Sequence, residues 1–434
     1  MTDLRSRFQS LDRARPPDLW PEIVARAAGA RADTPTMASG TSRMVILLAA
    51  LLLLGALAAG IVFGMLRTEE ASGGGLIAFP LNDEIDGRGD AGIFATRIGG
   101  IPRRIIGAQD DGIEEVCPAF SPDGRLLAYG VRMVGQSATG EDNRSWVVIV
   151  SLDADGSLTP LHRLPGGEPG GEFAGTPCPK WSPDSSAVAW HDDTQLRIAP
   201  LDGAVASLDL TPNSGQSPGP PISWTHDGRA IALASFGQVL IVPVDGGEPR
   251  ILMTARTDGD LQEDFHSVAA SPTGPMLAVA GEWWRAEPGG GRSQASGFMR
   301  VLDADGRVVV EETSPLQGLR WHSGAPAWSP DGTRLAWGSN RGLEMLDVEK
   351  GTLVALDPGP WPAEGGNRIS LASSVRWSPD GTRLLFIGRR VAADQWALVS
   401  IAVDGPPDPV VLTDWGFELY AEFGEDLTWQ PPPP

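Results

Sequence analysis

The fold is decided by a short stretch that recurs along the chain, with two intact copies at Trp328-Ser329-Pro330-Asp331-Gly332 and Trp377-Ser378-Pro379-Asp380-Gly381. Further copies begin at Phe120, Trp181 and Trp224, and a degenerate copy begins at Ser271. Counted from the Ser or Thr, successive copies lie 61, 43, 46, 58 and 49 residues apart. A period of this size is typical of a solenoid or a propeller.

Each copy predicts a strand, a tight turn and a second strand. Pro presets φ in the turn, Asp bonds to its own backbone, and Gly adopts a φ that other residues resist. An alternating apolar run follows, and a second hairpin with an Asp–Gly turn completes the repeat, as at residues 244–247 and 302–306. Four short strands per repeat, arranged radially, predict an all-β protein of the β-propeller type.

The pattern Trp-Ser-Pro-Asp-Gly-x-x-Leu-Ala resembles the signature of TolB-type, WD40-like bacterial propellers, and the resemblance covers roughly residues 75–432. It implies a propeller fold. It implies no particular activity, because propellers host many unrelated functions.

The two ends of this region predict how the ring closes. Residues 76–79, 92–96 and 103–106 supply three strands with no Trp-Ser-Pro strand ahead of them, and residues 426–431 match an inner strand with no repeat after it. We expect the C-terminal strand to complete the first blade, which hides an edge strand and closes the ring. Six internal copies and this shared blade predict seven blades. Six blades are the alternative if the copy at Ser271 forms none.

The charge of the chain argues against nucleic acid as a partner. The net charge is −21, and the residues after position 67 hold 26 Lys and Arg against 50 Asp and Glu. A body this acidic is repelled by phosphate backbones, so we expect no nucleic-acid binding. The basic residues are nearly all Arg, with only Lys180 and Lys350 as exceptions, which indicates a bacterial source of high GC content.

A membrane anchor is predicted ahead of the propeller. Residues 44–66 contain no charge and lie between Arg43 and Arg67, and this length spans a bilayer. Cleavage after residues 56–58, as in a secretory signal, is the alternative. The Arg excess before this segment places the N-terminus inside and the propeller outside the cytoplasmic membrane. The expected parts are therefore residues 1–42 in the cytoplasm, a transmembrane helix at 43–67, a flexible linker at 68–74 and the propeller at 75–432.

The N-terminal segment has two interpretations. Residues 18–28 predict a short amphipathic helix, which is too short to be stable alone. Residues 1–42 are either a tail without a role or a docking segment for a cytoplasmic partner. They resemble the N-terminal segments of membrane-anchored anti-sigma-like proteins, although they lack the His/Cys zinc pattern of many of those.

The two cysteines occupy equivalent positions in neighbouring repeats. Cys117 and Cys178 each lie four residues before the repeat Ser, and each is followed by Pro. Thiols outside the cytoplasm tend to be oxidised, which favours a disulfide between two blades. Two buried thiols too far apart to bond are the alternative. We expect no metal and no cofactor, because no His or Cys pair stands at ligand spacing.

The candidate binding residues lie in the connections between strands. Two connections from second to third strand are long, at residues 130–145 and 281–297, and long loops on a rigid scaffold often hold binding sites. The candidates on this loop-rich face are Trp283, Trp284, Arg285, Arg320, Trp321, His322, Trp361 and His266. Packing of these tryptophans onto the blades is the alternative for each of them. The Gly-x-Ser-x-Gly match at residues 215–219 lies in a Pro-rich connection and lacks the strand–turn–helix setting of a nucleophile elbow.

These features predict a membrane-anchored, extracytoplasmic propeller that binds a protein or glycan of the cell envelope and is not an enzyme. The first alternative is a transmembrane signalling protein of anti-sigma type, with the propeller as sensor. The second is a propeller enzyme acting on envelope glycans through His266 and His322, for which the sequence offers no nearby nucleophile.

Overall fold

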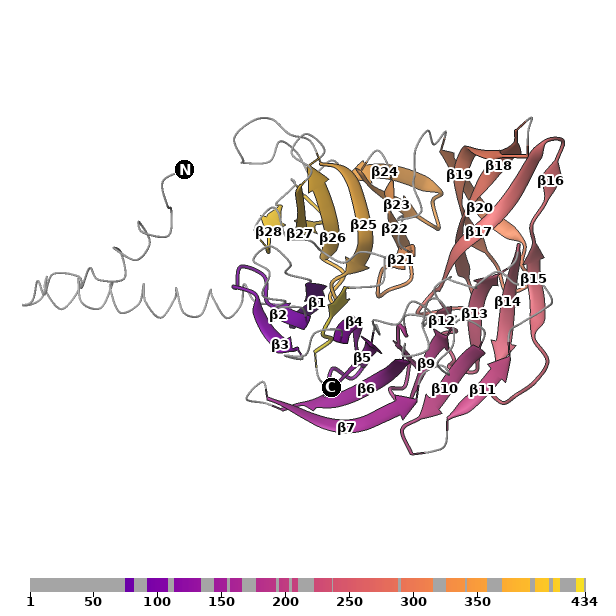
Figure 1. Ribbon diagram of the computed structural model, residues 1–434. Helices are drawn as coiled ribbons and strands as arrows, with labels where there is room; N and C mark the ends of the chain where they lie inside the picture. The colour runs from indigo at the N-terminus through magenta and orange to yellow at the C-terminus, as the bar shows by residue number, and fades with distance from the viewer. Residues whose placement is uncertain are drawn as a thin grey trace, which may run out of the picture. The chain divides into compact units, whose positions relative to one another are not determined.

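Strands that follow one another along the chain pair into separate sheets, which are arranged in a ring in the computed structural model (Figure 1). The structure describes residues 75–81, 92–107, 113–133, 144–153, 157–165, 177–192, 195–202, 205–209, 222–235, 237–287, 290–314, 325–339, 342–356, 369–390, 395–405, 409–413 and 427–432. The chain divides into the units Met1–Glu70 and Ala71–Pro434, and every described residue belongs to the second.

The described strands form seven sheets, and the chain is a seven-bladed β-propeller, as the repeat count predicts. Blade 1 consists of β29 (Thr428–Trp429), β1 (Ile77–Leu81), β2 (Gly92–Thr96) and β3 (Arg103–Ile106). Blade 2 consists of β4 (Ile113–Phe120), β5 (Leu126–Met133), β6 (Arg144–Leu152) and β7 (Leu158–Pro165). Blade 3 consists of β8 (Lys180–Trp181), β9 (Ala187–Asp192), β10 (Gln195–Pro200) and β11 (Ala206–Asp209).

The remaining blades follow the same strand order with one addition. Blade 4 consists of β12 (Ile222–Trp224), β13 (Ala230–Ser235), β14 (Gln238–Pro243) and β15 (Arg250–Thr254). Blade 5 consists of β16 (Thr257–Asp258), β17 (Leu261–Ala270), β18 (Leu277–Ala286), β19 (Arg292–Leu302) and β20 (Val308–Ser314). Blade 6 consists of β21 (Ala327–Trp328), β22 (Arg334–Ser339), β23 (Gly342–Asp347) and β24 (Thr352–Leu356). Blade 7 consists of β25 (Ile369–Trp377), β26 (Arg383–Arg390), β27 (Gln395–Ala402) and β28 (Val410–Val411).

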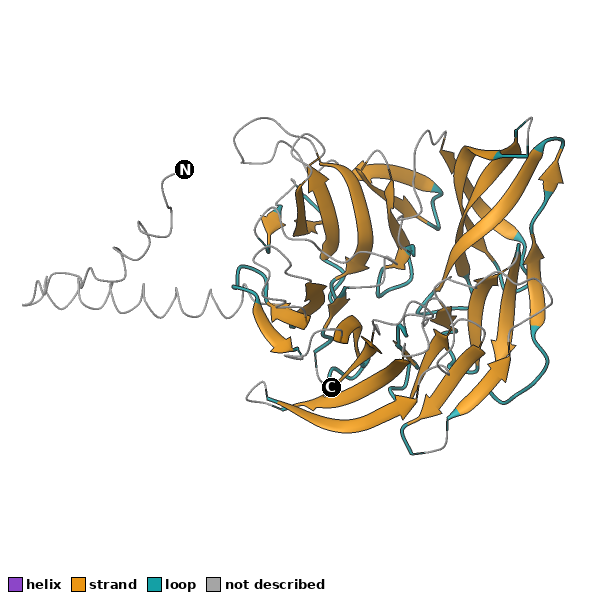
Figure 2. Ribbon diagram, in the orientation of Figure 1, coloured by secondary structure: helices purple, strands orange, loops and turns teal. Residues whose placement is uncertain are grey.

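Blade 5 departs from the expected four strands, because β16 pairs with β17 and adds a fifth. The degenerate copy at Ser271 therefore forms a complete blade, and the six-bladed alternative is wrong. The described part of the chain contains strands, turns and loops, as Figure 2 shows. The described residues include no helix long and apolar enough to cross a membrane. The expected amphipathic helix and the expected anchor at residues 44–66 lie outside the described residues.

The C-terminal strand closes the ring, as expected. Ile77 of β1 pairs with Trp429 of β29 in antiparallel register. Gln430 then fastens this strand at three points. Its backbone N–H donates to Leu76 O at 2.7 Å, its Oε1 accepts from Leu76 N at 3.2 Å, and its Nε2 donates to Gly124 O of blade 2 at 2.9 Å. The side chain of Gln430 thus ties the end of the chain to two blades at once.

The Ser hydroxyl and the Asp carboxylate of each Ser-Pro-Asp-Gly turn fix the turn through hydrogen bonds. In blade 6, Ser329 Oγ donates to Asp331 Oδ1 at 2.5 Å and accepts from Arg334 N at 2.9 Å. The same Asp oxygen accepts from Thr333 N at 3.0 Å. Gly332 adopts a φ of 70°, which favours glycine at this position. The hydroxyl-to-carboxylate bond recurs in the pairs Ser121–Asp123, Ser182–Asp184, Thr225–Asp227 and Ser378–Asp380.

Neighbouring blades are held together by apolar clusters and by a repeated indole hydrogen bond. One cluster of buried residues lies between each pair of adjacent blades, and the cluster between blades 1 and 7 contains Ile77, Phe79 and Trp429. The repeat tryptophan donates from Nε1 to a backbone carbonyl of the preceding blade at 2.9 to 3.0 Å. These bonds run from Trp181 to Ala119, Trp224 to Lys180, Trp328 to Ala269 and Trp377 to Ala327.

The contribution of this indole bond is testable with a matched pair of tryptophans. Trp328 and Trp429 are 8% and 7% exposed, but the Trp429 Nε1 has no hydrogen-bond partner in the described part of the chain. We expect Trp328→Phe to lower the free energy of unfolding by about 1 kcal/mol more than Trp429→Phe, because only the former leaves a carbonyl unpaired. Urea unfolding of both variants measures the difference. Equal losses would contradict the role of the bond.

The carboxylates of the Ser-Pro-Asp-Gly turns make the stability of the fold depend on pH. The hydrogen bond from Ser329 lowers the pKa of Asp331, and the bonds from Ser182 and Thr225 do the same for Asp184 and Asp227. A carboxyl group with a lowered pKa in the folded state stabilises the fold above its unfolded pKa of about 3.9. This stabilisation is lost as the pH falls through the lower, folded pKa.

We therefore expect the propeller to lose stability as the pH falls below about 4. Asp331→Asn retains an oxygen acceptor for Ser329 but removes the charge, so the variant should lose less stability on acidification than the wild type. Unfolding midpoints in urea at pH 5 and pH 3 test this. Asp245→Asn, at an exposed turn outside the repeat motif, is the control. The expectation fails if Asp331→Asn and the wild type lose stability equally.

Candidate ligand-binding face

The longest strands of the ring belong to blade 5 and form an extended sheet there. β17 and β18 each contain 10 residues and β19 contains 11. The register continues from Ala270↔Leu277 through to Leu261↔Arg285, and on the other side of β18 it reaches Ala286↔Arg292. The expected long loop at residues 281–297 is therefore wrong. Most of this stretch is strand, and a short turn joins the two strands. Trp283 and Trp284 pair with residues of β17 on one side and of β19 on the other, and aromatic residues favour a pleated sheet.

Trp283 and Trp284 lie on opposite faces of this sheet. Side chains alternate along a strand, so Val279 and Trp283 share one face while Ala280 and Trp284 share the other. Val279 and Trp283 pack in the cluster between blades 4 and 5. Ala280 packs in the cluster between blades 5 and 6. The two tryptophans therefore do not form one aromatic platform, and each has its own surroundings.

The face toward blade 4 contains a buried ion-pair network. The side chains of Glu263 and Arg300 are both fully buried, and Arg300 Nη2 lies 2.5 Å from Glu263 Oε1 and 2.9 Å from Glu311 Oε1. Arg256 Nη2 lies 2.9 Å from Glu263 Oε1. Burial alone would raise the pKa of Glu263, but hydrogen bonds from Arg256 and Arg300 outweigh it and hold that pKa below its usual value. The Arg300 guanidinium also stacks over Phe298 at 4.0 Å.

The face toward blade 6 combines an imidazole, carboxylates and a guanidinium. His266 Nε2 lies 3.2 Å from Glu282 Oε2, and Glu282 is 6% exposed. Arg292 stacks over the Trp284 ring at 4.6 Å and places Nη1 3.8 Å from Asp264 Oδ2. Asp264 and Glu282 are cross-strand partners in the register of β17 and β18. His266 contacts Glu282 from a point where a bulge interrupts that register, between Phe265 and Ser267.

Half of the expected site residues are placed by the structure. Trp283, Trp284, Arg285 and His266 all lie in the blade 5 sheet, but on different faces of it. Arg285 Nε lies 3.0 Å from Asp260 Oδ2 at the exposed end of the sheet. The other four lie outside the described residues, and they remain predictions: Arg320, Trp321, His322 and Trp361.

The buried charged residues of this sheet were not predicted from the sequence. Arg300 stands in the apolar run Phe298-Met299-Arg300-Val301-Leu302, and this break in the pattern was a visible signal of a buried ion pair. Asp264 and Glu282 gave no comparable signal, because their grouping depends on strand register. Among the described residues, no group of three or more His, Cys, Asp or Glu side chains is arranged to hold a metal ion.

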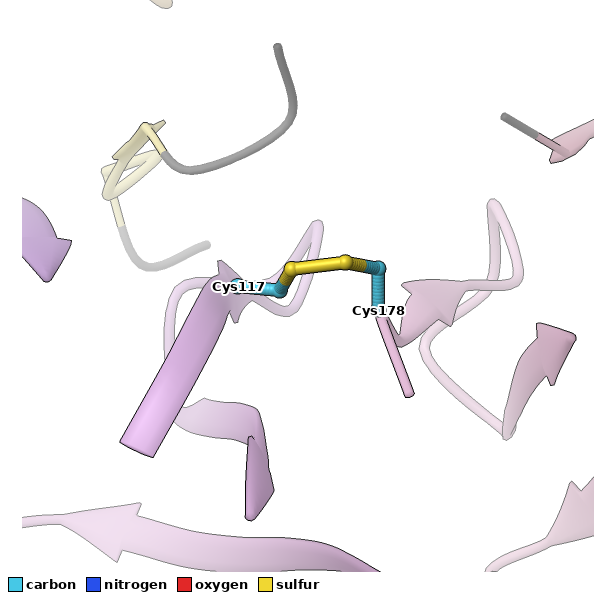
Figure 3. The surroundings of a disulfide bond; sticks show 2 residues. All are labelled: Cys117 and Cys178. Carbon is cyan, nitrogen blue, oxygen red and sulfur yellow. A yellow bond between two sulfur atoms is a disulfide. The ribbon is translucent and has the colours of Figure 1, made fainter. Parts of the chain in front are cut away.

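A disulfide joins Cys117 and Cys178 across the boundary between blades 2 and 3 (Figure 3). Their Cα atoms lie 5.0 Å apart, within the range that a disulfide requires. Cys117 is 2% exposed and sits at a bulge in β4, between Val116 and Ala119, with a φ of 51°. The bulge turns the side chain of Cys117 out of the regular pleat, toward the residues that precede β8.

Comparison with known proteins yields fold neighbours but no relatives by sequence. No family model matches the chain, and no curated protein matches it significantly. A periplasmic gluconolactonase from Pseudomonas aeruginosa is 15% identical with a TM-score of 0.47, over 82% of this chain and 98% of that one. A protein described as TolB from Agrobacterium tumefaciens is 14% identical with a TM-score of 0.36, over 82% and 96%. The propeller assignment rests on the strand order and ring closure described above.

The disulfide provides a test of its own. Because it encloses a span of 61 residues, we expect its removal to lower the free energy of unfolding by roughly 2–4 kcal/mol. Denaturant unfolding of the wild type with and without reductant measures this effect. The double variant Cys117→Ser/Cys178→Ser should match the reduced wild type and be indifferent to reductant. An unchanged midpoint on reducing the wild type would show that the bond does not stabilise the ring.

Proposed function

We propose that this chain is a membrane-anchored bacterial protein whose propeller lies outside the cytoplasmic membrane and binds a protein or glycan of the cell envelope. In this proposal it is a binding or scaffold module and catalyses no reaction. The observation that supports it best is the extended sheet of blade 5. This sheet presents arginine, tryptophan and carboxylate side chains on strands that are paired on both sides.

The exposed end of the sheet has the composition of a recognition surface. The side chains of Arg256, Arg285 and Arg292 are 58%, 53% and 53% exposed, and each lies beside a carboxylate that orients it. Arg256 and Arg292 also stack on Trp283 and Trp284. Arginine and tryptophan are enriched among the residues that dominate binding energy, and side chains held in place lose little entropy on binding.

Two features support a location outside the cytoplasm. The disulfide between Cys117 and Cys178 belongs to an oxidising compartment. The uncharged segment at residues 44–66, with its Arg-rich flank, predicts an anchor with the C-terminal part outside. The acidic propeller is also suited to a partner that is neutral or basic.

Capture of an envelope component by the full-length, affinity-tagged chain tests this function. We expect Arg285→Ala/Arg292→Ala to reduce the yield of the captured component at least tenfold, since these guanidiniums lie at the proposed contact. Arg103→Ala/Arg104→Ala on β3 removes the same charge from the exposed outer edge of blade 1 and should leave the yield unchanged. Equal capture by both variants, or loss in both, would contradict a site on blade 5.

A further inference from the structure

The face of blade 5 toward blade 6 holds two buried hydrogen-bond donors that lack acceptors. Trp284 Nε1 and Gln294 Nε2 are both buried without a hydrogen-bond partner in the described part of the chain. The two residues are direct cross-strand partners on β18 and β19. Directly paired residues project to the same face of a sheet, so both side chains belong to one site.

Such a pair needs an explanation, because burying a donor without an acceptor costs roughly a tenfold factor in stability or more. Unpaired indole N–H groups also occur at Trp190 and Trp429, but those rings are members of apolar clusters between blades. Trp284 differs, since it belongs to no such cluster and lies among polar residues. Buried polar groups without protein partners often mark a place that water or a ligand occupies.

Acceptors stand beside these donors on the same face. Glu282 precedes Trp284 by two positions on β18, which places the two side chains on one face about 7 Å apart along the strand. His266 contacts Glu282, and Arg292 stacks on Trp284 while reaching toward Asp264. Donors without acceptors therefore lie next to carboxylates within a single cluster.

We propose that this cluster binds an uncharged carbohydrate, and we call it the sugar site: Asp264, His266, Glu282, Trp284, Arg292 and Gln294. A sugar hydroxyl both accepts and donates a hydrogen bond, so neighbouring hydroxyls satisfy Trp284 Nε1 and Gln294 Nε2 while donating to Glu282. Two carboxylates and an acidic propeller disfavour an anionic ligand. The proposal rests on the binding function proposed above and narrows its ligand to a neutral glycan.

Binding of defined sugars to the full-length chain tests the proposal. The probes are glucose, galactose, N-acetylglucosamine and cellobiose, with glucuronate as the anionic counterpart, screened by saturation-transfer NMR and quantified by calorimetry. We expect at least one neutral sugar to bind, and Trp284→Phe and Gln294→Leu each to weaken it about tenfold, as for one lost hydrogen bond. Trp190→Phe, which removes an equally unpaired indole donor from the apolar cluster between blades 2 and 3, should leave the affinity within twofold.

Thermal unfolding without sugar separates the sugar site from a purely structural pairing. If the Gln294 amide, whose oxygen and nitrogen can be interchanged, accepts from Trp284 internally, Gln294→Leu should lower the unfolding temperature. The proposal expects an equal or higher temperature, because the variant removes an unmatched donor. A lower temperature together with unchanged sugar binding would overturn the sugar site.

The remaining outcomes distinguish this inference from the proposed function. If no neutral sugar binds, or glucuronate binds more tightly, while Arg285→Ala/Arg292→Ala still abolishes capture of an envelope protein, the sugar site is wrong and the binding function stands. If the full-length chain neither captures an envelope component nor binds a sugar, both are wrong.

Discussion

The structure depends on one constraint: the first and last strands of the propeller, β1 and β29, must pair to close the ring. Residues 354 positions apart make this closure, through the pairing of β1 with the two residues of β29 and through Gln430. If β29 were absent, the cluster that Ile77 and Phe79 share with blade 7 would be exposed along one side. Gln430 stands where the internal copies have Ser or Thr. Its longer amide side chain reaches both Leu76 of blade 1 and Gly124 of blade 2. Gln therefore suits this position, where the strand closes the ring instead of leading into a turn.

Blade 5 forms although its copy of the repeat departs most from the Trp-Ser-Pro-Asp-Gly pattern. Its copy has Ala270 in place of Trp and Thr273 in place of Asp, so it lacks both the indole donor and the turn carboxylate. A different bond replaces the first, since Ala270 N donates to Ser223 Oγ of blade 4 at 2.9 Å. The blade instead gains stability from its length, with strands of 10 and 11 residues and a fifth strand. The extension that presents the candidate site therefore occurs in the blade that conforms least to the repeat.

Sequence alone could predict the features that repeat, and it failed where the structure depends on register. The six copies from Phe120 to Trp377 predict six blades, and the unmatched strands at both ends predict a seventh, shared blade, because these rest on local turn and strand patterns. Trp283 and Trp284 were expected together on one loop-rich face, yet alternation along the strand places them on opposite faces of the sheet. The placement of His266 beside Glu282 follows a bulge, and no local pattern in the sequence reveals a bulge of this kind.

The two faces of the blade 5 sheet differ in how their charged and polar groups are paired. Toward blade 4, the fully buried Glu263 and Arg300 are paired with each other and with Arg256 and Glu311, although Arg300 Nε and Nη1 have no hydrogen-bond partner in the described part of the chain. A buried ion pair of this kind adds little net stability, but breaking it is costly, so it fixes one arrangement of the strands. Toward blade 6, the donors Trp284 Nε1 and Gln294 Nε2 lie on the same face as carboxylates but form no hydrogen bond in the described part of the chain. A sheet held rigid on one face can keep such unmatched groups in place on the other, so under the proposal above a ligand would meet side chains whose strands are already ordered.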